Sequence, residues 1–196
     1  MRSQSKFIAL FMPLLLAVAV APAFADDPPA WMRQASAAAV PGYDKDVPAV
    51  VLYDEQMVSL NSDGKLTTTE NYAIKLLSRE GRRHAIARAF YLVSTGKVKE
   101  IQAWVIRPGG TSKEYDKKTV LDVISDQDDV YNEGRVKVID ASDDVDTGYV
   151  FGYTIVTEES PLFYQDQWAF QSRLPTLMSR YALNLPSGWT ATSFYV

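Results

Sequence analysis

From residue 50 onward, apolar side chains alternate with polar ones, and this period of two limits the possible folds more than any other feature of the chain. In the segment 66–77, Tyr72, Ile74 and Leu76 fall on one face, while hydroxyl and amide side chains fall on the other. The turn sequence NSDG precedes this segment at 61–64. The pattern predicts a strand with one buried and one solvated face.

Similar segments recur along the chain, separated by polar turns and without helices between them. The predicted strands are 50–57, 66–77, 85–93, 98–107, a short one within 107–115, 135–139, 149–157, 168–171 and 181–185. The segment 117–126 fits either one helical turn or a strand. Successive strands joined by turns predict an all-β fold, an antiparallel β-sandwich over residues 48–196.

A lead-in segment, residues 26–47, precedes the predicted sandwich and is rich in proline and alanine. One short helix is expected there, from Trp31 to Ala39, because Pro28 and Pro29 suit a helix start and Pro41 follows its end.

Residues 1–25 have the pattern of a signal peptide. Arg2 and Lys6 precede a 14-residue apolar run at 7–20, and the sequence AFA at 23–25 predicts cleavage before Asp26. The alternative is an uncleaved anchor, but the run is short for a membrane span of about 20 residues. With no cysteine in the chain, we expect a periplasmic protein, or alternatively a secreted one, that is not inserted in the membrane after cleavage.

The net charge of the chain limits the kind of ligand that it can bind. Removing Arg2 and Lys6 with the signal changes the net charge from −4 to −6, which disfavours nucleic acid as a ligand.

Eight carboxylates lie between Asp126 and Asp146 and raise the question of a calcium site. An EF-hand loop needs glycine at position 6 and glutamate at position 12, and neither Asp126 nor Asp140 starts such a register. A looser site built from Asp126, Asp128 and Asp129 is one reading; two solvated loops flanking a strand are the favoured one. No metal or cofactor is expected.

Catalytic patterns are weak. The single histidine, His84, lies beside Arg79, Arg82 and Arg83, and the sequence contains none of the common nucleophile, metalloprotease or phosphate-loop motifs. A carboxylate pair for glycoside hydrolysis is defined by separation in space, so the sequence leaves that class open. We therefore expect no enzyme activity and no catalytic residue.

Two side-chain groups have both a functional and a structural interpretation. The three arginines could bind an anion or an acidic partner, or form a solvated turn, which is favoured. The four tryptophans could stack on sugars, or lie in the core, which is favoured. The tryptophans are Trp31, Trp104, Trp168 and Trp189.

Four blocks of the sequence resemble the uncharacterised domain that precedes bacterial transglutaminase-like cores of the papain-like type. They begin VVLYDEQMVSL (50), GKVKEIQAWV (96), VYNEGRVKVI (130) and WAFQSRLPTL (168). The resemblance covers about residues 48–196 and implies an exported β-sandwich. The cysteine-histidine-aspartate core of such proteins has no counterpart here, so no catalytic residue is carried over.

The resemblance and the residues together leave two functions open. One is a non-catalytic interaction or scaffolding module of the cell envelope; the other is a truncated fragment of a transglutaminase-like cysteine peptidase or acyltransferase. The sequence YALNLPSGWTATSFYV (181–196) predicts a hairpin whose second strand begins at Trp189 and carries Phe194 and Tyr195. We expect this uncharged edge, at the end of an incomplete sandwich, to pair with a partner protein or a second copy; the alternative is a complete sheet and a monomer.

Overall fold

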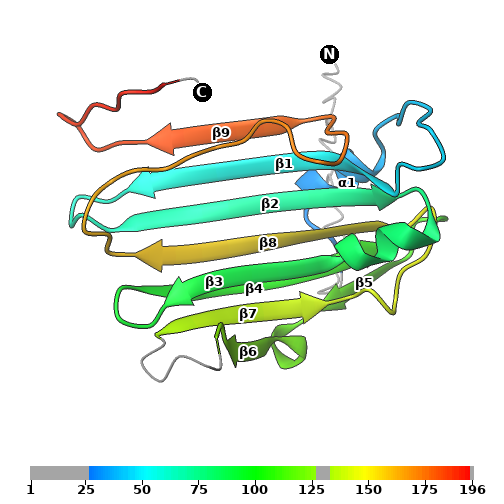
Figure 1. Ribbon diagram of the computed structural model, residues 1–196, viewed down its shortest axis with the longest axis horizontal. Helices are drawn as coiled ribbons and strands as arrows, with labels where there is room; N and C mark the ends of the chain where they lie inside the picture. The colour runs from blue at the N-terminus through cyan, green and yellow to red at the C-terminus, as the bar shows by residue number, and fades with distance from the viewer. Residues whose placement is uncertain (1–26, 127–132, 195–196) are drawn as a thin grey trace, which may run out of the picture.

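The computed structural model describes residues 27–126 and 133–194 as a β-sandwich with one short helix (Figure 1). The larger sheet has six strands in the order β5-β4-β8-β2-β1-β9, and the smaller sheet has three in the order β3-β7-β6. The strands are β1 Ala49–Leu60, β2 Leu66–Leu76, β3 Ile86–Leu92, β4 Gly96–Ile106, β5 Ser112–Tyr115, β6 Leu121–Ile124, β7 Gly134–Asp140, β8 Val150–Glu159 and β9 Ser179–Asn184. The predicted sandwich is confirmed.

The main core lies between the two sheets. Phe151 and Tyr153 of β8 face Ile74 and Tyr72 of β2 in register, and the rings of Tyr72 and Tyr153 stack at 5.3 Å. Alanines of β3 and Ile139 of β7 close this core from the smaller sheet. Small residues on β3 let the two sheets approach closely, as the packing of two twisted sheets requires.

The second face of the larger sheet is partly buried, whereas the alternation predicts a solvated face. Helix α1, Ala30–Ser36, lies on it and buries Met32 completely. Gly152 makes room for this side chain, because a Cβ there would lie 3.0 Å from the Met32 sulfur. The predicted helix is thus confirmed, although it ends three residues before Ala39, and it covers an apolar patch that includes Trp104.

The segment 117–126 contains both of the alternatives that its sequence left open. A 3₁₀ turn η2, Lys117–Thr119, is capped by the Asp116 carboxylate and leads directly into β6. A second 3₁₀ helix, η1 Arg79–His84, joins β2 to β3.

Strand β9 is parallel to β1, whereas every other pairing of neighbouring strands is antiparallel. Strand β8 runs in the same direction as β9, because β8 and β1 are both antiparallel to β2. Parallel strands need a crossover connection that returns the chain to the starting end of the sheet. Residues 160–178, here called the crossover segment, make this return across the face of the larger sheet (Figure 1).

Two of the predicted strands are wrong. Residues 168–171 are not a strand but part of the crossover segment. Residues 189–194 after the Pro186–Gly188 turn do not form the predicted second strand of a C-terminal hairpin either. Both segments have the apolar composition of strands, but neither pairs with a neighbour among the described residues.

Candidate interaction surface

Strand β9 forms one edge of the larger sheet. It pairs with β1 on one side, and no strand of the described chain lies on its other side. The Asp54 N–H donates to the Met178 carbonyl at 3.0 Å, so the even-numbered residues here direct their backbone groups toward β1. Because backbone groups alternate along a strand, Ser179, Tyr181 and Leu183 present their N–H and C=O groups to the free edge.

This edge lacks the usual protection against strand pairing. The single charged residue of β9 is Arg180, and its guanidinium lies 3.1 Å from the buried Glu55 carboxylate, on β1. No proline interrupts the strand. The other three edges differ. Strands β5 and β6 have four residues each, with Lys113 in the first and Asp122 in the second, and β3 carries the exposed Arg88. Short strands and charges are how proteins normally block an edge, and the one charge of β9 is paired with Glu55, so β9 is the least protected of the four.

On the face toward the smaller sheet, polar contacts hold β9 and the crossover segment together. The Asp166 carboxylate accepts hydrogen bonds from the Gln56 amide at 2.8 Å and the Tyr181 hydroxyl at 3.0 Å. Trp168 donates its indole N–H to the Ser179 hydroxyl at 3.1 Å and packs near the Tyr181 ring. Burial, and then the hydrogen bond to Asp166, raise the pKa of Tyr181 to about 12.

On the opposite face, a buried polar row connects β9 to the interior of the sheet. Glu55, only 4% exposed, accepts from the Asn71 amide at 3.3 Å and pairs with Arg180. The Thr154 hydroxyl in turn donates to the Asn71 carbonyl at 2.8 Å. Buried polar groups need such partners. Side chains therefore anchor β9 on both faces, and what remains unpaired is its backbone edge.

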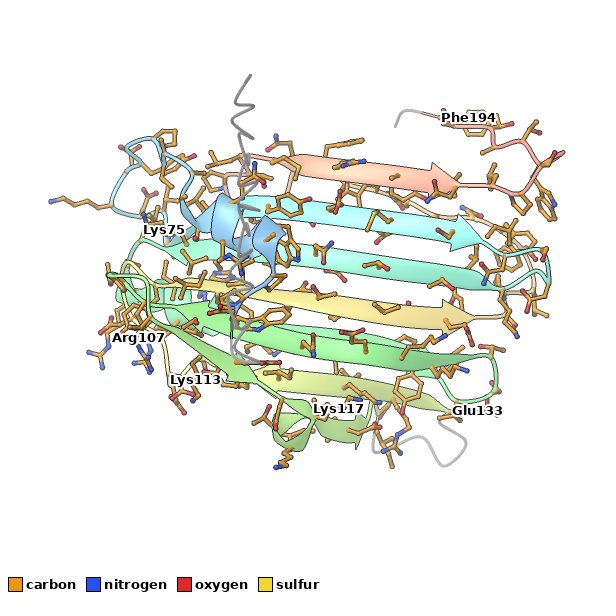
Figure 2. The ribbon with its side chains drawn as sticks, turned by 180° about the vertical axis from the view of Figure 1, so that it is seen from behind. Lys75, Arg107, Lys113, Lys117, Glu133 and Phe194 are labelled. Carbon is orange, nitrogen blue, oxygen red and sulfur yellow. The ribbon has the colours of Figure 1, made fainter. Side chains whose placement is uncertain are left out.

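Exposed apolar side chains border this edge. Leu177 precedes β9, Leu183 lies within it, and both are partly exposed. Beyond the strand, the Trp189 ring contacts Tyr164 edge-on at 5.4 Å, and Phe194 is 83% exposed. Figure 2 shows Phe194 outside β9, directed away from the sheet. We call Leu177, β9, Trp189 and Phe194 the β9 surface. Exposed apolar side chains beside an unpaired strand edge make this surface a candidate interaction site.

The smaller sheet has a second exposed apolar face. Phe90 of β3, Val136 of β7 and Val123 of β6 form one cross-strand row, in register. Val138 and Leu121 form part of the next row. Phe90, Val123 and Leu121 are exposed, although such an outer face is usually polar. The sequence alternation had suggested the strands but not which face of them would be uncovered.

Near the Asp54 carboxylate, Glu70 lies beside the tyrosines of the core. The Tyr153 hydroxyl donates to Glu70 at 2.5 Å. Burial nevertheless raises the pKa of Glu70, and repulsion from Asp54 adds to this rise. Burial likewise raises the pKa of Asp54. The ionised forms of Glu70 and Asp54 therefore destabilise the folded protein.

Replacing Glu70 with glutamine is expected to stabilise the protein at pH 7. Because the pKa of Glu70 is raised in the folded state, ionisation above that pKa opposes folding, and the penalty disappears as the pH falls toward the unfolded value. The gain in melting temperature should therefore be largest at neutral pH and shrink toward pH 4. Melting curves of both proteins across this range test it; a gain that is equal at every pH would contradict it. The glutamine carbonyl can still accept from Tyr153.

The arginine cluster and the second acidic loop, far apart in sequence, meet at one end of the sandwich. Arg82 of η1 donates to the Ser142 carbonyl at 2.8 Å and lies 3.6 Å from the Asp143 carboxylate. Lys113 and Tyr115 donate to Asp144 at 2.6 and 2.7 Å, and these bonds lower its pKa. The carboxylates of this acidic loop thus pair with side chains of η1 and β5, as expected of a structural loop.

The predicted site residues do not assemble into a metal or catalytic site within the described chain. No group of three potential metal ligands occurs among residues 27–126 and 133–194. Of the looser calcium site, Asp126 follows β6, whereas Asp128 and Asp129 lie outside the described residues. Burial, and then the charge of Arg83, lower the pKa of His84. That histidine is therefore poorly suited to carry a positive charge.

The four tryptophans are dispersed and form no common platform. Trp104 is buried under α1, where its indole N–H has no partner among the described residues, and Trp31 packs against Tyr53. Trp168 and Trp189 belong to the crossover segment and the β9 surface. The sequence predicted an open edge on the second strand of a C-terminal hairpin, but it did not place that edge on β9, because no local pattern shows that β9 pairs on one side only.

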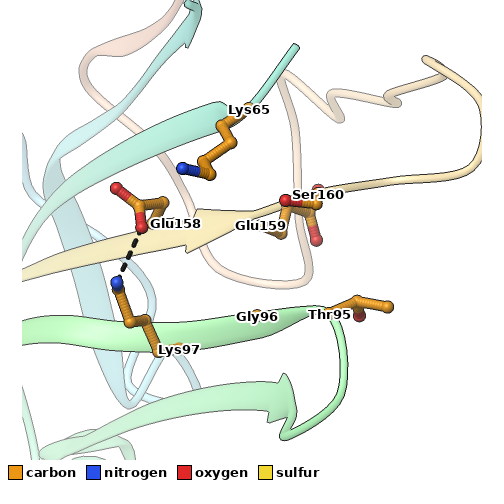
Figure 3. Close-up of a pocket in the computed structure, with 7 residues that line it drawn as sticks. All are labelled: Lys65, Thr95, Gly96, Lys97, Glu158, Glu159 and Ser160. Carbon is orange, nitrogen blue, oxygen red and sulfur yellow. Dashed lines mark ion pairs between the residues drawn. The ribbon is translucent and has the colours of Figure 1, made fainter. Parts of the chain in front are cut away.

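A shallow depression lies at the end of the β4–β8 pair (Figure 3). Its volume is about 230 Å³, and Lys65, Lys97 and Glu158 line it together with the main chain around Gly96. Glu158 pairs with Lys97 at 2.8 Å and Lys99 at 3.2 Å, and these hydrogen bonds lower its pKa. The depression is smaller than the typical site for a small ligand, and its charges are already paired.

The architecture thus defines an all-β sandwich module whose most distinctive surface is an open edge strand. Residues 62–195 match the family described as a domain of unknown function with solved structure, DUF3857. The chain belongs to this family. No curated protein matches it.

A solved structure shares the fold. It is titled a "putative protease" from Parabacteroides distasonis ATCC 8503, with a TM-score of 0.63 and 14% sequence identity. The match covers 72% of this chain and 29% of that one, so this chain corresponds to less than a third of the solved protein. No helix in the described parts of this chain is long and apolar enough to cross a membrane.

Proposed function

We propose that this protein is a non-catalytic interaction module of the bacterial cell envelope, of the kind that accompanies transglutaminase-like cores. It binds a partner protein through the β9 surface. The proposal rests on one observation: β9 is an edge strand without proline whose single charged residue, Arg180, is paired with Glu55, and exposed apolar side chains border it. Strand addition at such an edge is an established mode of protein recognition, because backbone hydrogen bonds provide the affinity.

A non-catalytic role agrees with the chemistry of the side chains. The chain has no cysteine, and the pKa of its single histidine is lowered by burial and by Arg83. Covalent catalysis needs an activated nucleophile beside a base. Membership of DUF3857 and the shared fold with the Parabacteroides protein support an accessory module, without assigning any activity of that protein to this chain.

The proposed location is the periplasm, with secretion as the alternative. It is supported by the signal-like residues 1–25 and by the absence of cysteine.

A photo-cross-linking experiment tests the interaction surface. Benzoylphenylalanine is introduced at Leu183 on β9, and separately at the exposed Glu100 on β4, which lies away from the edge. After irradiation of cells that export the protein, cross-linked species should form from position 183 and not from position 100. Equal yields at the two positions, or no product at position 183, would contradict a specific β9 surface.

A further inference from the structure

We propose that the partner at this edge is a second copy of the same chain, whose β9 pairs antiparallel with the first about a two-fold axis at Tyr181. This inference rests on the proposed function and specifies its partner. The two larger sheets would then form one continuous sheet across the dimer. Such isologous pairing, in which the same surface meets itself, is the commonest form of protein assembly.

The backbone of β9 is complementary to itself. Ser179, Tyr181 and Leu183 direct both of their backbone groups outward. With the axis at Tyr181, this residue faces its own copy, and Ser179 faces Leu183 of the second molecule. All three positions then become hydrogen-bonded pairs of an antiparallel ladder, so every outward backbone group of the strand gains a partner.

The side chains favour this register over the one centred on Arg180. Opposite Arg180 the second copy places Ala182, a small neutral residue, and the guanidinium keeps its contact with Glu55. An axis at Arg180 would instead place two arginines directly opposite each other, which is unfavourable. The register at Tyr181 also forms a cross-strand tyrosine pair, and aromatic pairs stabilise a ladder.

Little structure has to yield to the second copy. Residues 189–194 lie beyond β9, and all of them are exposed. Trp189 donates its backbone N–H to the Pro186 carbonyl within the turn, and its ring contacts Tyr164. The segment forms no ladder with β9. Moving it aside breaks no strand pairing, and segments with so few contacts open at low cost.

The absence of cysteine permits a direct test of the register. Tyr181→Cys places one cysteine at the axis, where a hydrogen-bonded antiparallel pair holds the two Cα atoms about 5.5 Å apart, within reach of a disulfide. Mild oxidation should convert most of the purified full chain to a covalent dimer. The matched variant Glu100→Cys should form no covalent dimer under the same conditions. If both variants cross-link equally, or neither does, the proposed pairing is wrong.

Sedimentation equilibrium of the cysteine-free protein measures the association itself. Leu183→Pro removes an outward N–H without removing a hydrogen bond to β1, and should abolish the dimer. Leu183→Lys adds a charge at the edge and should weaken association at least about tenfold. This variant keeps the test valid if Leu183→Pro fails to fold. The inference would be overturned if the cysteine-free protein were monomeric at every concentration, or if Leu183→Lys left the dimer dissociation constant unchanged. A monomer that still photo-cross-links from position 183 to another protein would overturn the second copy alone and leave the proposed function standing.

Discussion

Replacing Phe151 with alanine is expected to lower the free energy of unfolding by about 3–5 kcal/mol, the usual loss for a fully buried phenylalanine. Phe151 has no exposed surface. It lies on β8, the strand between β4 and β2, where Val105 and Ile74 are its neighbours in register. Alanine would leave a cavity in a core closed by two sheets, and neither sheet can collapse into it without breaking its own ladder.

Urea unfolding followed by circular dichroism measures this loss. The matched control is Phe194→Ala, because Phe194 is 83% exposed in the described chain. Its unfolding free energy should change by less than about 0.5 kcal/mol. Similar losses for both variants would mean that the core is not the one described.

The second large effect is expected from Gly81→Ala, which should destabilise the protein by about 1–3 kcal/mol through overpacking. A Cβ at this position would lie 2.4 Å from the Pro48 carbonyl oxygen. That oxygen accepts the backbone N–H groups of Leu77 and Ser78 at 2.9 and 3.1 Å. Two backbones meet there, so relief requires η1 or the start of β1 to move, and the two hydrogen bonds would lengthen.

Thermal melting compares this variant with Gly42→Ala. No heavy atom lies within 4 Å of a Cβ built at Gly42, and its φ is not positive. Alanine there should be neutral or slightly stabilising, since it restricts the unfolded chain. A Gly81→Ala variant as stable as Gly42→Ala would show that this contact between β1 and η1 is absent.

The strands of the main core could be predicted because their signal is local. In β8, Phe151, Tyr153 and Ile155 share a face in the sequence, and the same residues lie in the core between the sheets. The alternation fails for β2 at Asn71, whose amide side chain was expected to face water but is buried. The cover on that face comes from α1 and from a polar row, and a period of two carries no information about either.

The sequence predicted that an uncharged edge would be exposed, but it placed that edge on the wrong strand. The uncharged end of the chain, with Trp189 and Phe194, predicted an exposed edge, but the edge belongs to β9, one strand earlier. Trp168 looked like part of a strand because aromatic residues favour strands. Its role in the crossover segment follows from the direction of β9, which is set by pairing with residues more than a hundred positions away.

The sequence by itself determined the all-β class, the approximate bounds of most strands and the short helix, since each depends on neighbours within a few residues. The tertiary structure alone decided that β9 joins β1 in parallel, that the crossover segment therefore spans the sheet, and that Arg82 meets the acidic loop. It also decided which edge remains open. These features depend on contacts between distant segments, and such contacts are selected by the fit of the whole core, which no local pattern records.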